Sequence, residues 1–516
     1  MVSHINSFSF NGINVIDVDV QVSIASGMPA FSIVGLGDKA VAESRERIRS
    51  ALGSIGLSLP AKRITVNLAP ADLTKEGSHF DLPIALGLLA CMKAIPADTL
   101  LDYIVIGELA LDGAISSVAG VLPAAVGATA QNKGIICPYK NLSEARWAGD
   151  IALLAPSHLL ELINHLKGTQ LLQLSYPTPS NDSSSISSTI PYPDLADIKG
   201  QETARRALEI AAAGSHNMLM VGPPGSGKSM LASRLPGILP DMSTSEMLDS
   251  SMVRSVAGNL PDGGLSTTRP FRSPHHNCSM AAMIGGGSKA RPGEVSLAHQ
   301  GVLFLDELPE FPAQVLDSLR QPLETRSVEI ARVQSHVTYP ASFQLVAAMN
   351  PCRCGYLGDA SRACNKAPRC GSDYLGKLSG PLLDRIDIHV EVPAVRPQDV
   401  FTATISENSE TVRHRVITAR TLQQQRYKEQ PYDTNAQADG DILYQYAMPD
   451  ENGLALLKEG VDQLGLSMRG YNRVLRVART IADLSNSSNV SSLHIAEALQ
   501  YREISFRRKQ PTTIPA

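Results

Sequence analysis

The stretch NMLMVGPPGSGKS, residues 217–229, decides the fold of the middle of this 516-residue chain. Residues 218–221 are all apolar, which is typical of a strand buried in a parallel sheet. The following GPPGSGKS fits the phosphate-binding pattern G-x-x-x-x-G-K-[ST]. Glycines let backbone N–H groups turn toward phosphate oxygens, and a helix beginning there points its positive end at the anion. The stretch therefore predicts a nucleotide site in a P-loop α/β fold.

Two neighbouring positions extend this site. Lys228 should reach the outer phosphates of ATP, and the Ser229 hydroxyl should bind Mg²⁺. In GVLFLDELPEF (301–311) an apolar strand delivers Asp306 and Glu307 to its carboxyl end, where open α/β sheets bind ligands. Asp306 suits the Mg²⁺ shell and Glu307 suits polarising the attacking water. The nucleotide-binding residues expected are Gly222, Pro223, Pro224, Gly225, Ser226, Gly227, Lys228 and Ser229.

Three further polar residues are candidates for the same chemistry. Asn350 ends the strand-like FQLVAAMN, where it can position water and contact the γ-phosphate. Arg385 lies in SGPLLDRIDIHVEVP and Arg469 in LSMRGYNRVLRV. From the residues alone, each arginine is either part of the site or an ordinary solvated or ion-paired side chain.

Composition narrows the class of protein. Hydrophobic residues are 43% and charged residues 19%, as in chains that bury a core. A net charge of −4 excludes a basic coat over the whole protein but leaves room for a local basic channel. We expect neither a signal peptide nor a membrane span, and seven cysteines do not indicate a disulfide scaffold. A cytoplasmic protein without a membrane partner is the expectation.

The pattern along the chain predicts a mixed α/β architecture in several parts. Early short apolar runs alternate with helical stretches, the middle alternates strands and helices as in a parallel sheet, and the end is mostly helical. The expected parts are an α/β domain at 1–168, a Ser/Pro-rich linker at 169–193, a P-loop core with helices on both faces of a parallel sheet at 194–395, a helical lid at 396–507 and a tail at 508–516.

Several motifs together resemble the magnesium-chelatase-like branch of the AAA+ ATPases. They are DIKGQETARRALEIAAAGSHNMLMVGPPGSGKS, FRSPHHNCSMAAMIGGGSKARPGEVSLAHQGVLFLDELPEF and SGPLLDRIDI. The resemblance implies that Asn350 is sensor 1, Arg469 is sensor 2 and Arg385 is an arginine finger for a neighbouring subunit. It also implies a ring, expected to be a homo-hexamer. Arg473 and Arg476 lie within two helical turns of Arg469 and compete for the sensor 2 role.

The first domain resembles the proteolytic domain of Lon-type proteases, which has a ribosomal-S5-domain-2-like fold. The resemblance is carried by VNLAPADLTKEGSHFDLPIALGLLA and IGELALDGAISSVAGVLPAAVGA. Ser78 lies near the nucleophile position, one residue out of register, with His79 closer to it. Leu122 stands where the lysine base should be. Without that base the hydroxyl stays a weak nucleophile, so we expect a non-proteolytic relative.

Two segments are candidates for DNA contact. Residues 283–295, which occupy an insert of the AAA+ branch, carry Lys289 and Arg291. Residues 324–341 alternate like a hairpin and carry Arg326 and Arg332. Such side chains in a ring pore would neutralise phosphates without reading sequence. The alternative is a solvated turn and an ordinary hairpin.

The segment after Asn350 holds Cys352, Cys354, Cys364 and Cys370. Four thiols so close together can bind zinc tetrahedrally, although the spacing is not that of paired C-x₂-C knuckles. Structural Zn²⁺ and thiols without a metal are both open interpretations.

The order of domains resembles the YifB/ComM family. That resemblance implies a bacterial ATP-hydrolysing ring that drives branch migration of DNA during natural transformation, with recombination proteins among its partners. Competing interpretations are the ATPase subunit of a metal chelatase, a protein-remodelling ATPase or protease, and a scaffold that binds ATP only to assemble.

Overall fold

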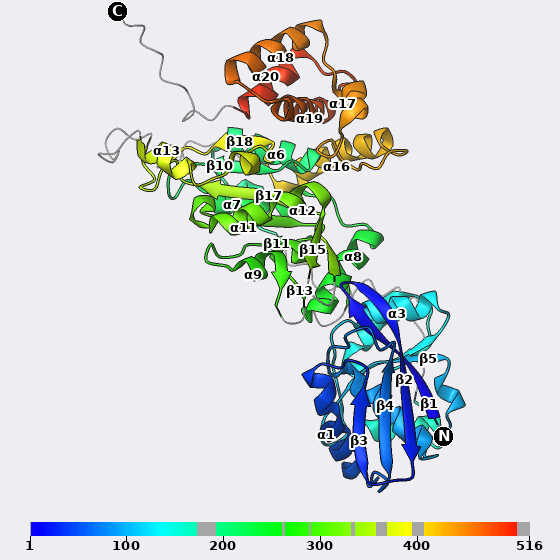
Figure 1. Ribbon diagram of the computed structural model, residues 1–516. Helices are drawn as coiled ribbons and strands as arrows, with labels where there is room; N and C mark the ends of the chain where they lie inside the picture. The colour runs from blue at the N-terminus through cyan, green and yellow to red at the C-terminus, as the bar shows by residue number, and fades with distance from the viewer. Residues whose placement is uncertain are drawn as a thin grey trace, which may run out of the picture.

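A computed structural model describes residues 2–172, 192–260, 264–287, 290–331, 336–357, 369–394 and 407–502. The molecule is elongated: the first α/β part lies at one end, the P-loop part in the middle and a helical part at the other end (Figure 1). Most of the expected linker and the whole of 508–516 lie outside the described residues. None of the helices in those ranges combines the length and apolar character needed to cross a bilayer.

The first part is built on a mixed sheet in the order β3-β4-β2-β1-β5-β8-β9. Strands β1 and β2 are antiparallel and joined by a tight turn, and β1 runs parallel to β5. The strands are β1 Val2–Asn11, β2 Asn14–Ala25, β3 Ala30–Val34, β4 Arg63–Ala69, β5 Tyr103–Val105, β8 Gly134–Ile136 and β9 Leu153–Leu154. The main helices are α1 Lys39–Ser54, α2 Asp81–Cys91, α3 Val121–Ala130 and α5 Leu159–Leu166, and a short hairpin pairs β6 Glu108–Leu109 with β7 Ile115–Ser116.

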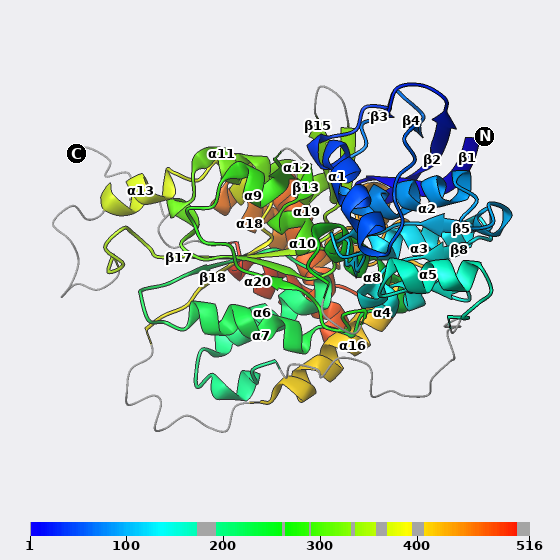
Figure 2. The ribbon, with the colours of Figure 1, turned by 90° about the horizontal axis from the view of Figure 1, so that it is seen from below.

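The middle part is a parallel sheet in the order β11-β14-β17-β10-β18. Its strands are β10 Met218–Val221, β11 Phe271–Arg272, β14 Val302–Leu305, β17 Gln344–Met349 and β18 Ile388–Glu391. Helices cover both faces, with α6 and α7 on one side and α9, α11 and α12 on the other (Figure 2). These helices are α6 Glu202–Gly214, α7 Lys228–Ile238, α9 Met280–Ile284, α11 Ala313–Ser318 and α12 Arg320–Thr325.

Strands β10 and β14 are apolar throughout because both faces of this sheet are buried. Met218 and Met220 pack into one hydrophobic core, whereas Leu219 and Val221 pack into another on the opposite face. This alternation follows from the two-residue period of a strand. Burying each such side chain stabilises the fold by about 1.5–3 kcal/mol. The doubly covered sheet confirms the predicted P-loop fold class.

Two hairpins and several short helices project from this sheet. The first hairpin pairs β12 Gly285–Gly286 with β13 Arg291–Pro292, and the second pairs β15 Ser327–Ala331 with β16 His336–Pro340. The second confirms the hairpin predicted for 324–341. The remaining helices here are α8 Thr244–Ala257, α10 Glu294–Leu297, α13 Arg369–Leu375 and α14 Gly380–Leu383.

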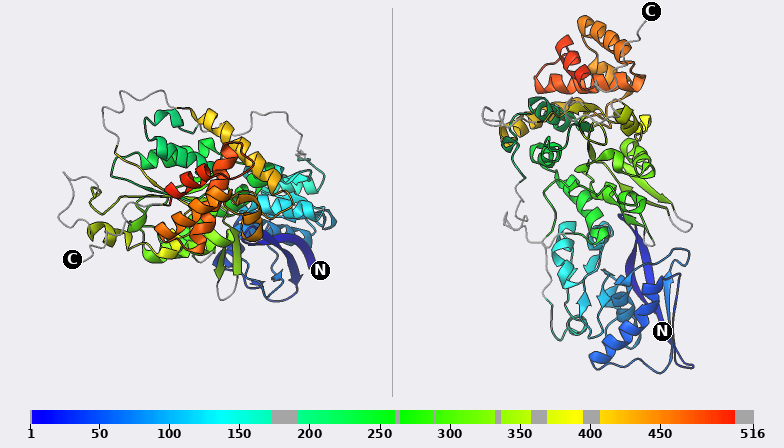
Figure 3. Two further views of the ribbon diagram at one scale, coloured as in Figure 1. Left: turned by 90° about the horizontal axis from the view of Figure 1, so that it is seen from above. Right: turned by 90° about the vertical axis from the view of Figure 1, so that its left-hand side faces the viewer.

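The last part is helical, as predicted, and lies at the end of the molecule away from the first part (Figures 1 and 3). Its helices are α16 Ser409–Arg426, α17 Gly440–Ala447, α18 Glu451–Leu464, α19 Met468–Leu484 and α20 Ser492–Gln500. Buried residues of α16 and α19 join the same hydrophobic core as α6 and α7. This shared core fixes the helical part on the P-loop part.

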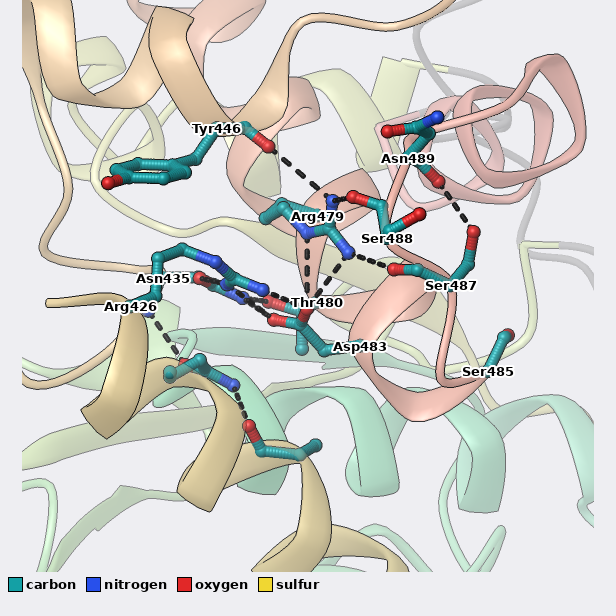
Figure 4. Close-up of polar contacts among 12 residues, drawn as sticks. Arg426, Asn435, Tyr446, Arg479, Thr480, Asp483, Ser485, Ser487, Ser488 and Asn489 are labelled. Atoms are coloured by element: carbon teal, nitrogen blue, oxygen red, sulfur yellow. Dashed lines mark hydrogen bonds and ion pairs between the residues drawn. The ribbon is translucent and has the colours of Figure 1, made fainter.

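A buried carboxylate also holds the helical part together (Figure 4). Asp483 accepts hydrogen bonds from Arg426 at 2.8 Å and from Arg479 at 2.9 Å, and its side chain is fully buried. Asn435 donates to the same carboxylate at 2.8 Å. Because the two guanidinium groups and the carboxylate satisfy each other, the charges can stay buried.

The first part rests directly on the P-loop part. The Gly120 N–H donates to the Ser255 carbonyl at 3.1 Å, and the Ser255 hydroxyl donates to the Glu144 carboxylate. The turn between β1 and β2 touches the second hairpin so closely that a Cβ at Gly12 would lie 2.6 Å from the Thr338 carbonyl oxygen. The hairpin expected to contact DNA is therefore in contact with the first part.

Candidate nucleotide-binding site

The loop 222–229 leaves β10 and leads into α7, as the sequence predicted. Gly225 and Gly227 have φ of +75° and +91°, in the left-handed region that glycine adopts without strain. A Cβ at Gly222 would lie 2.1 Å from the Val392 carbonyl oxygen, so only glycine fits there. The sequence pattern thus reflects two physical needs, a tight turn and close backbone packing.

The Lys228 amine lies inside this loop. It donates to the carbonyl oxygens of Gly222 and Pro223, both at 2.8 Å, and to the Asn350 side-chain oxygen at 3.3 Å. Burial lowers the pKa of Lys228, while the charges of Asp306 and Glu307 act in the opposite direction. Asn350 follows β17 directly, so two parallel neighbouring strands bring the loop and the predicted sensor residue together.

The acidic pair lies at the same edge. The Ser229 hydroxyl donates to Asp306 Oδ2 at 2.7 Å, which places the two oxygens predicted to bind Mg²⁺ side by side. A hydroxyl and a carboxylate are hard oxygen ligands, which is the donor set that Mg²⁺ prefers. Asp306 Oδ1 accepts the Glu307 N–H at 2.9 Å.

Glu307 has a left-handed backbone with φ of +52°. This conformation costs about 1–3 kcal/mol in a residue with a side chain and is common at functional sites. The carboxylate is half-exposed, and the His276 ring nitrogen Nδ1 lies 3.3 Å from it. The sequence analysis assigned His276 no role at this site, although the motif SPHHN contains it.

The two predicted arginines do not join this group. Arg385 and Arg469 line a cavity of about 890 Å³ together with Asn217 and Gln344, which stand at the amino ends of β10 and β17. The nucleotide loop stands at the carboxyl ends of the same parallel strands. Since β17 spans six residues, the two edges are separated by about 20 Å. Neither arginine reaches the nucleotide loop of its own chain.

The contacts of the arginines in this cavity differ. Arg473 pairs with Asp387 at 3.0 Å and Arg476 pairs with Asp439 at 3.0 Å. Arg469 is exposed, and within the described ranges it makes no hydrogen bond or ion pair. Of the three candidates for sensor 2, Arg469 is therefore the one whose guanidinium is available to a ligand.

Arg385 is nearly buried beside the same cavity. Its guanidinium donates to the Glu324 carboxylate and, at 2.7 Å, to the Pro381 carbonyl oxygen. The half-exposed Glu324 holds the side chain at the surface of the cavity. A neighbouring phosphate would compete with this carboxylate for the guanidinium.

Arg291 and Arg326, the described residues among those predicted to bind DNA, lie on different surfaces. Arg326 ends α12 and lines the arginine cavity, whereas Arg291 is exposed beside a second cavity of about 1030 Å³. The second cavity lies between the two hairpins and the first part of the chain, and His336 and Ser78 also line it. Lys289 and Arg332 lie outside the described residues.

Three of the four predicted zinc ligands converge. The sulfur atoms of Cys352, Cys354 and Cys370 lie within 4.8 Å of one another, and the first two are 3.0 Å apart. A tetrahedral zinc site with Zn–S bonds of about 2.3 Å holds its sulfurs about 3.8 Å apart, so binding would move the Cys352 and Cys354 sulfurs slightly apart. Cys364 lies outside the described residues.

In the first part, Ser78 and Leu122 occupy the positions that the sequence aligned with a Ser–Lys dyad. The Ser78 hydroxyl donates to the Glu108 carboxylate, and Leu122 is a fully buried core residue. His79 is buried against Phe10 and Phe80, and burial lowers its pKa to about 4. The non-proteolytic character of this domain stays a prediction.

Comparisons with known proteins identify the family to which the chain belongs. Families described as "Magnesium chelatase, subunit ChlI", "Subunit ChlI of Mg-chelatase" and "Magnesium chelatase, subunit ChlI C-terminal" match residues 194–400, 20–141 and 406–502. "Uncharacterized protein YifB" of Escherichia coli is 42% identical over 96% of this chain and 95% of its own length.

Two other relatives complete the comparison. "Competence protein ComM" of Haemophilus influenzae is 43% identical over 94% of both chains. "Lon protease 2" of Bacillus subtilis is 25% identical over 30% of this chain and 32% of its own length. With nearly full-length matches above 40% identity, the chain belongs to the YifB/ComM family of magnesium-chelatase-like AAA+ ATPases.

Proposed function

We propose that the chain is an ATP-hydrolysing ring motor that acts on DNA. The observation that carries this proposal is the division of the hydrolysis residues between the two edges of one sheet. Lys228, Ser229, Asp306, Glu307 and Asn350 stand at the carboxyl edge, whereas the two candidate arginines stand at the amino edge. A complete site then requires two chains.

At the carboxyl edge the geometry supports the following proposed roles. The loop N–H groups and Lys228 bind the phosphates of ATP, and Ser229 with Asp306 holds Mg²⁺, which neutralises phosphate charge when bound. Glu307 accepts a proton from the attacking water, and Asn350 orients that water beside the γ-phosphate. His276, at 3.3 Å, keeps the Glu307 carboxylate at the edge of the sheet.

The neighbouring chain supplies the arginines in this proposal. Arg385 and Arg469 approach the γ-phosphate across the interface and stabilise charge that develops in the transition state. A head-to-tail interface of this kind closes into a ring, and the AAA+ family implies six subunits. ATP hydrolysis is therefore coupled to assembly.

The substrate proposed is DNA, held by backbone contacts that do not depend on sequence. The exposed Arg291 on the first hairpin is the described basic residue best placed for this, and Arg326 belongs with the interface arginines. The family resemblance and a relative named as a competence protein support branch migration during natural transformation. A cytoplasmic location and a structural Zn²⁺ at the cysteine cluster are parts of the same proposal.

The test is ATP turnover of the purified chain, alone and with single-stranded, duplex and four-way-junction DNA. Turnover should rise with DNA and vanish in Lys228→Ala, with junction DNA then tested for migration of its branch point. Turnover unchanged by every DNA would overturn the DNA motor. Casein left intact in the presence of ATP would separate this function from that of a protease.

A second candidate is the ATPase subunit of a metal chelatase, because three family descriptions name that subunit. Such a chain hydrolyses ATP to drive metal insertion and has no need of DNA. DNA-independent turnover that is lost in Lys228→Ala would favour this candidate or a protein-remodelling ATPase.

A further inference from the structure

The three converging cysteines come from two segments that flank the nucleotide loop. Cys352 and Cys354 lie in a turn closed by a hydrogen bond from the Gly355 N–H to the Cys352 carbonyl oxygen at 3.0 Å. Cys370 lies in the first turn of α13. Cys352 is fully buried and Cys354 is exposed, so the cysteine cluster lies at the protein surface with one side open to solvent.

The turn at residues 352–355 packs against the nucleotide loop. A Cβ at Gly355 would lie 2.5 Å from Pro224 Cδ and 2.7 Å from Pro224 Cγ. The backbone of Gly355 is therefore in direct contact with a residue of the phosphate-binding loop. Any displacement of this turn displaces Pro224 or opens a gap beside it.

The same cluster is joined to the other two elements of the site. Cys352 is two residues after Asn350, whose side chain accepts a hydrogen bond from Lys228. Just after α13, the Lys377 amine pairs with the Glu310 carboxylate at 3.4 Å. Glu310 is three residues after Glu307. Thiol ligands in these segments are thus linked to the phosphate loop, the sensor and the catalytic glutamate.

We propose that Cys352, Cys354 and Cys370 bind Zn²⁺ as a clasp that holds the phosphate-binding loop and Asn350 in position for ATP. Thiolates are soft ligands that select Zn²⁺ over Mg²⁺, so the clasp and the catalytic metal do not compete. This inference deepens the proposed function because it gives the zinc a task at the nucleotide site. Zinc occupancy then sets nucleotide affinity.

The first experiment compares zinc content with nucleotide affinity in the full chain. Zinc is measured by elemental analysis, and affinity by titration with a fluorescent ATP analogue and Mg²⁺. The wild type should hold about one zinc per chain. Cys352→Ser and Cys370→Ser should lose the zinc and bind the analogue about tenfold or more weakly. Cys91→Ser, in the first part of the chain, should retain both properties.

A second variant tests the mechanical link and leaves every thiol in place. Gly355→Ala should keep its zinc and still bind the analogue more weakly, because the new Cβ displaces Pro224. Gly56→Ala is the matched control, since Gly56 has φ of +80° against +85° for Gly355 and no atom within 4 Å of the added Cβ. Equal affinities of the two glycine variants would overturn the clasp.

Two further outcomes would also overturn the inference. One is a wild-type chain produced with ample zinc that contains none. The other is a zinc-free cysteine variant, folded by circular dichroism, that binds the analogue as the wild type does. Failure of the DNA motor has a separate signature, which is wild-type turnover that no DNA stimulates.

Discussion

Two inactive variants should restore activity when they are mixed. Lys228→Ala removes the phosphate ligand at the carboxyl edge of the sheet, and Arg385→Ala removes the arginine at the amino edge. The two edges are about 20 Å apart along six-residue β17, which is farther than an arginine side chain extends. In the ring that we propose, each site takes its lysine from one chain and its arginine from the next.

The size of the effect follows from this geometry. An arginine finger contributes about 10³–10⁵ in rate, which corresponds to about 4–7 kcal/mol, so each variant alone should be inactive. In an equal mixture, a site works when its lysine comes from an Arg385→Ala chain and its arginine from a Lys228→Ala chain. Random assembly gives about one site in four and hence about a quarter of wild-type turnover per chain.

The assay is steady-state ATP hydrolysis at a fixed total protein concentration, with DNA present. Native mass spectrometry on chains of different mass would establish that the rings are mixed. A mixture no more active than its two components, although mixed rings are present, would refute the placement of Arg385 in the neighbouring site. Arg320→Ala is a suitable companion control, because Arg320 is a surface residue whose nearest carboxylate, Asp317, is 4.0 Å away.

Three other predictions concern single residues. Glu307→Gln should lower ATP turnover by about 10²-fold or more while ATP affinity persists, and equal loss of both would contradict its role as a base. Asp483→Ala should destabilise the helical part by about 3–5 kcal/mol, because Arg426 and Arg479 lose their buried partner. It should lower the thermal midpoint of unfolding far more than Asp462→Ala, a control at an exposed position. Burial alone would raise the pKa of Asp387, but His216 and Arg473 hold this pKa well below its ordinary value of 3.8. The ionised Asp387 therefore contributes its full stabilisation above pH 3.8 and loses it as the pH falls through the lower pKa of the folded state. Thermal midpoints between neutral pH and pH 3 should therefore fall less in Asp387→Asn than in the wild type, and parallel curves would contradict this.

The sequence could predict the nucleotide edge because each element there is local. Short sequence patterns predict the glycine loop at 222–229, the strand before Asp306 and the strand before Asn350. Parallel strands then place their carboxyl ends together at one edge of the sheet. The convergence of Cys352 and Cys370 could be predicted for the same reason, since they are close in the sequence. His276 was missed because its contact with Glu307 depends on how a loop packs against the sheet.

Residues whose position depends on the docking of whole parts were harder to place. Arg326 was grouped with the DNA-contacting residues because it lies in the hairpin-like segment 324–341. It instead has a left-handed backbone at the end of α12 and lines the cavity that Arg385 and Arg469 also line. The site of Arg291 is set by the first part of the chain, which no local pattern describes. Charge along a segment identified basic residues but not the surface they face.

A buried polar network fixes the helical part on the sheet. The position of this part explains why the candidate catalytic residues lie at two opposite edges of the sheet. Arg473 pairs with Asp387 at the amino end of β18, and the buried His216 ring contacts both that carboxylate and the Thr480 hydroxyl of α19. These contacts anchor α19 at the amino edge of the sheet. With its neighbour Arg473 anchored there, Arg469 one turn earlier faces outward at that edge and away from the nucleotide loop of its own chain. The buried network thus keeps the exposed arginine away from the nucleotide loop of its own chain, which supports our proposal that Arg469 acts in the site of a neighbouring subunit.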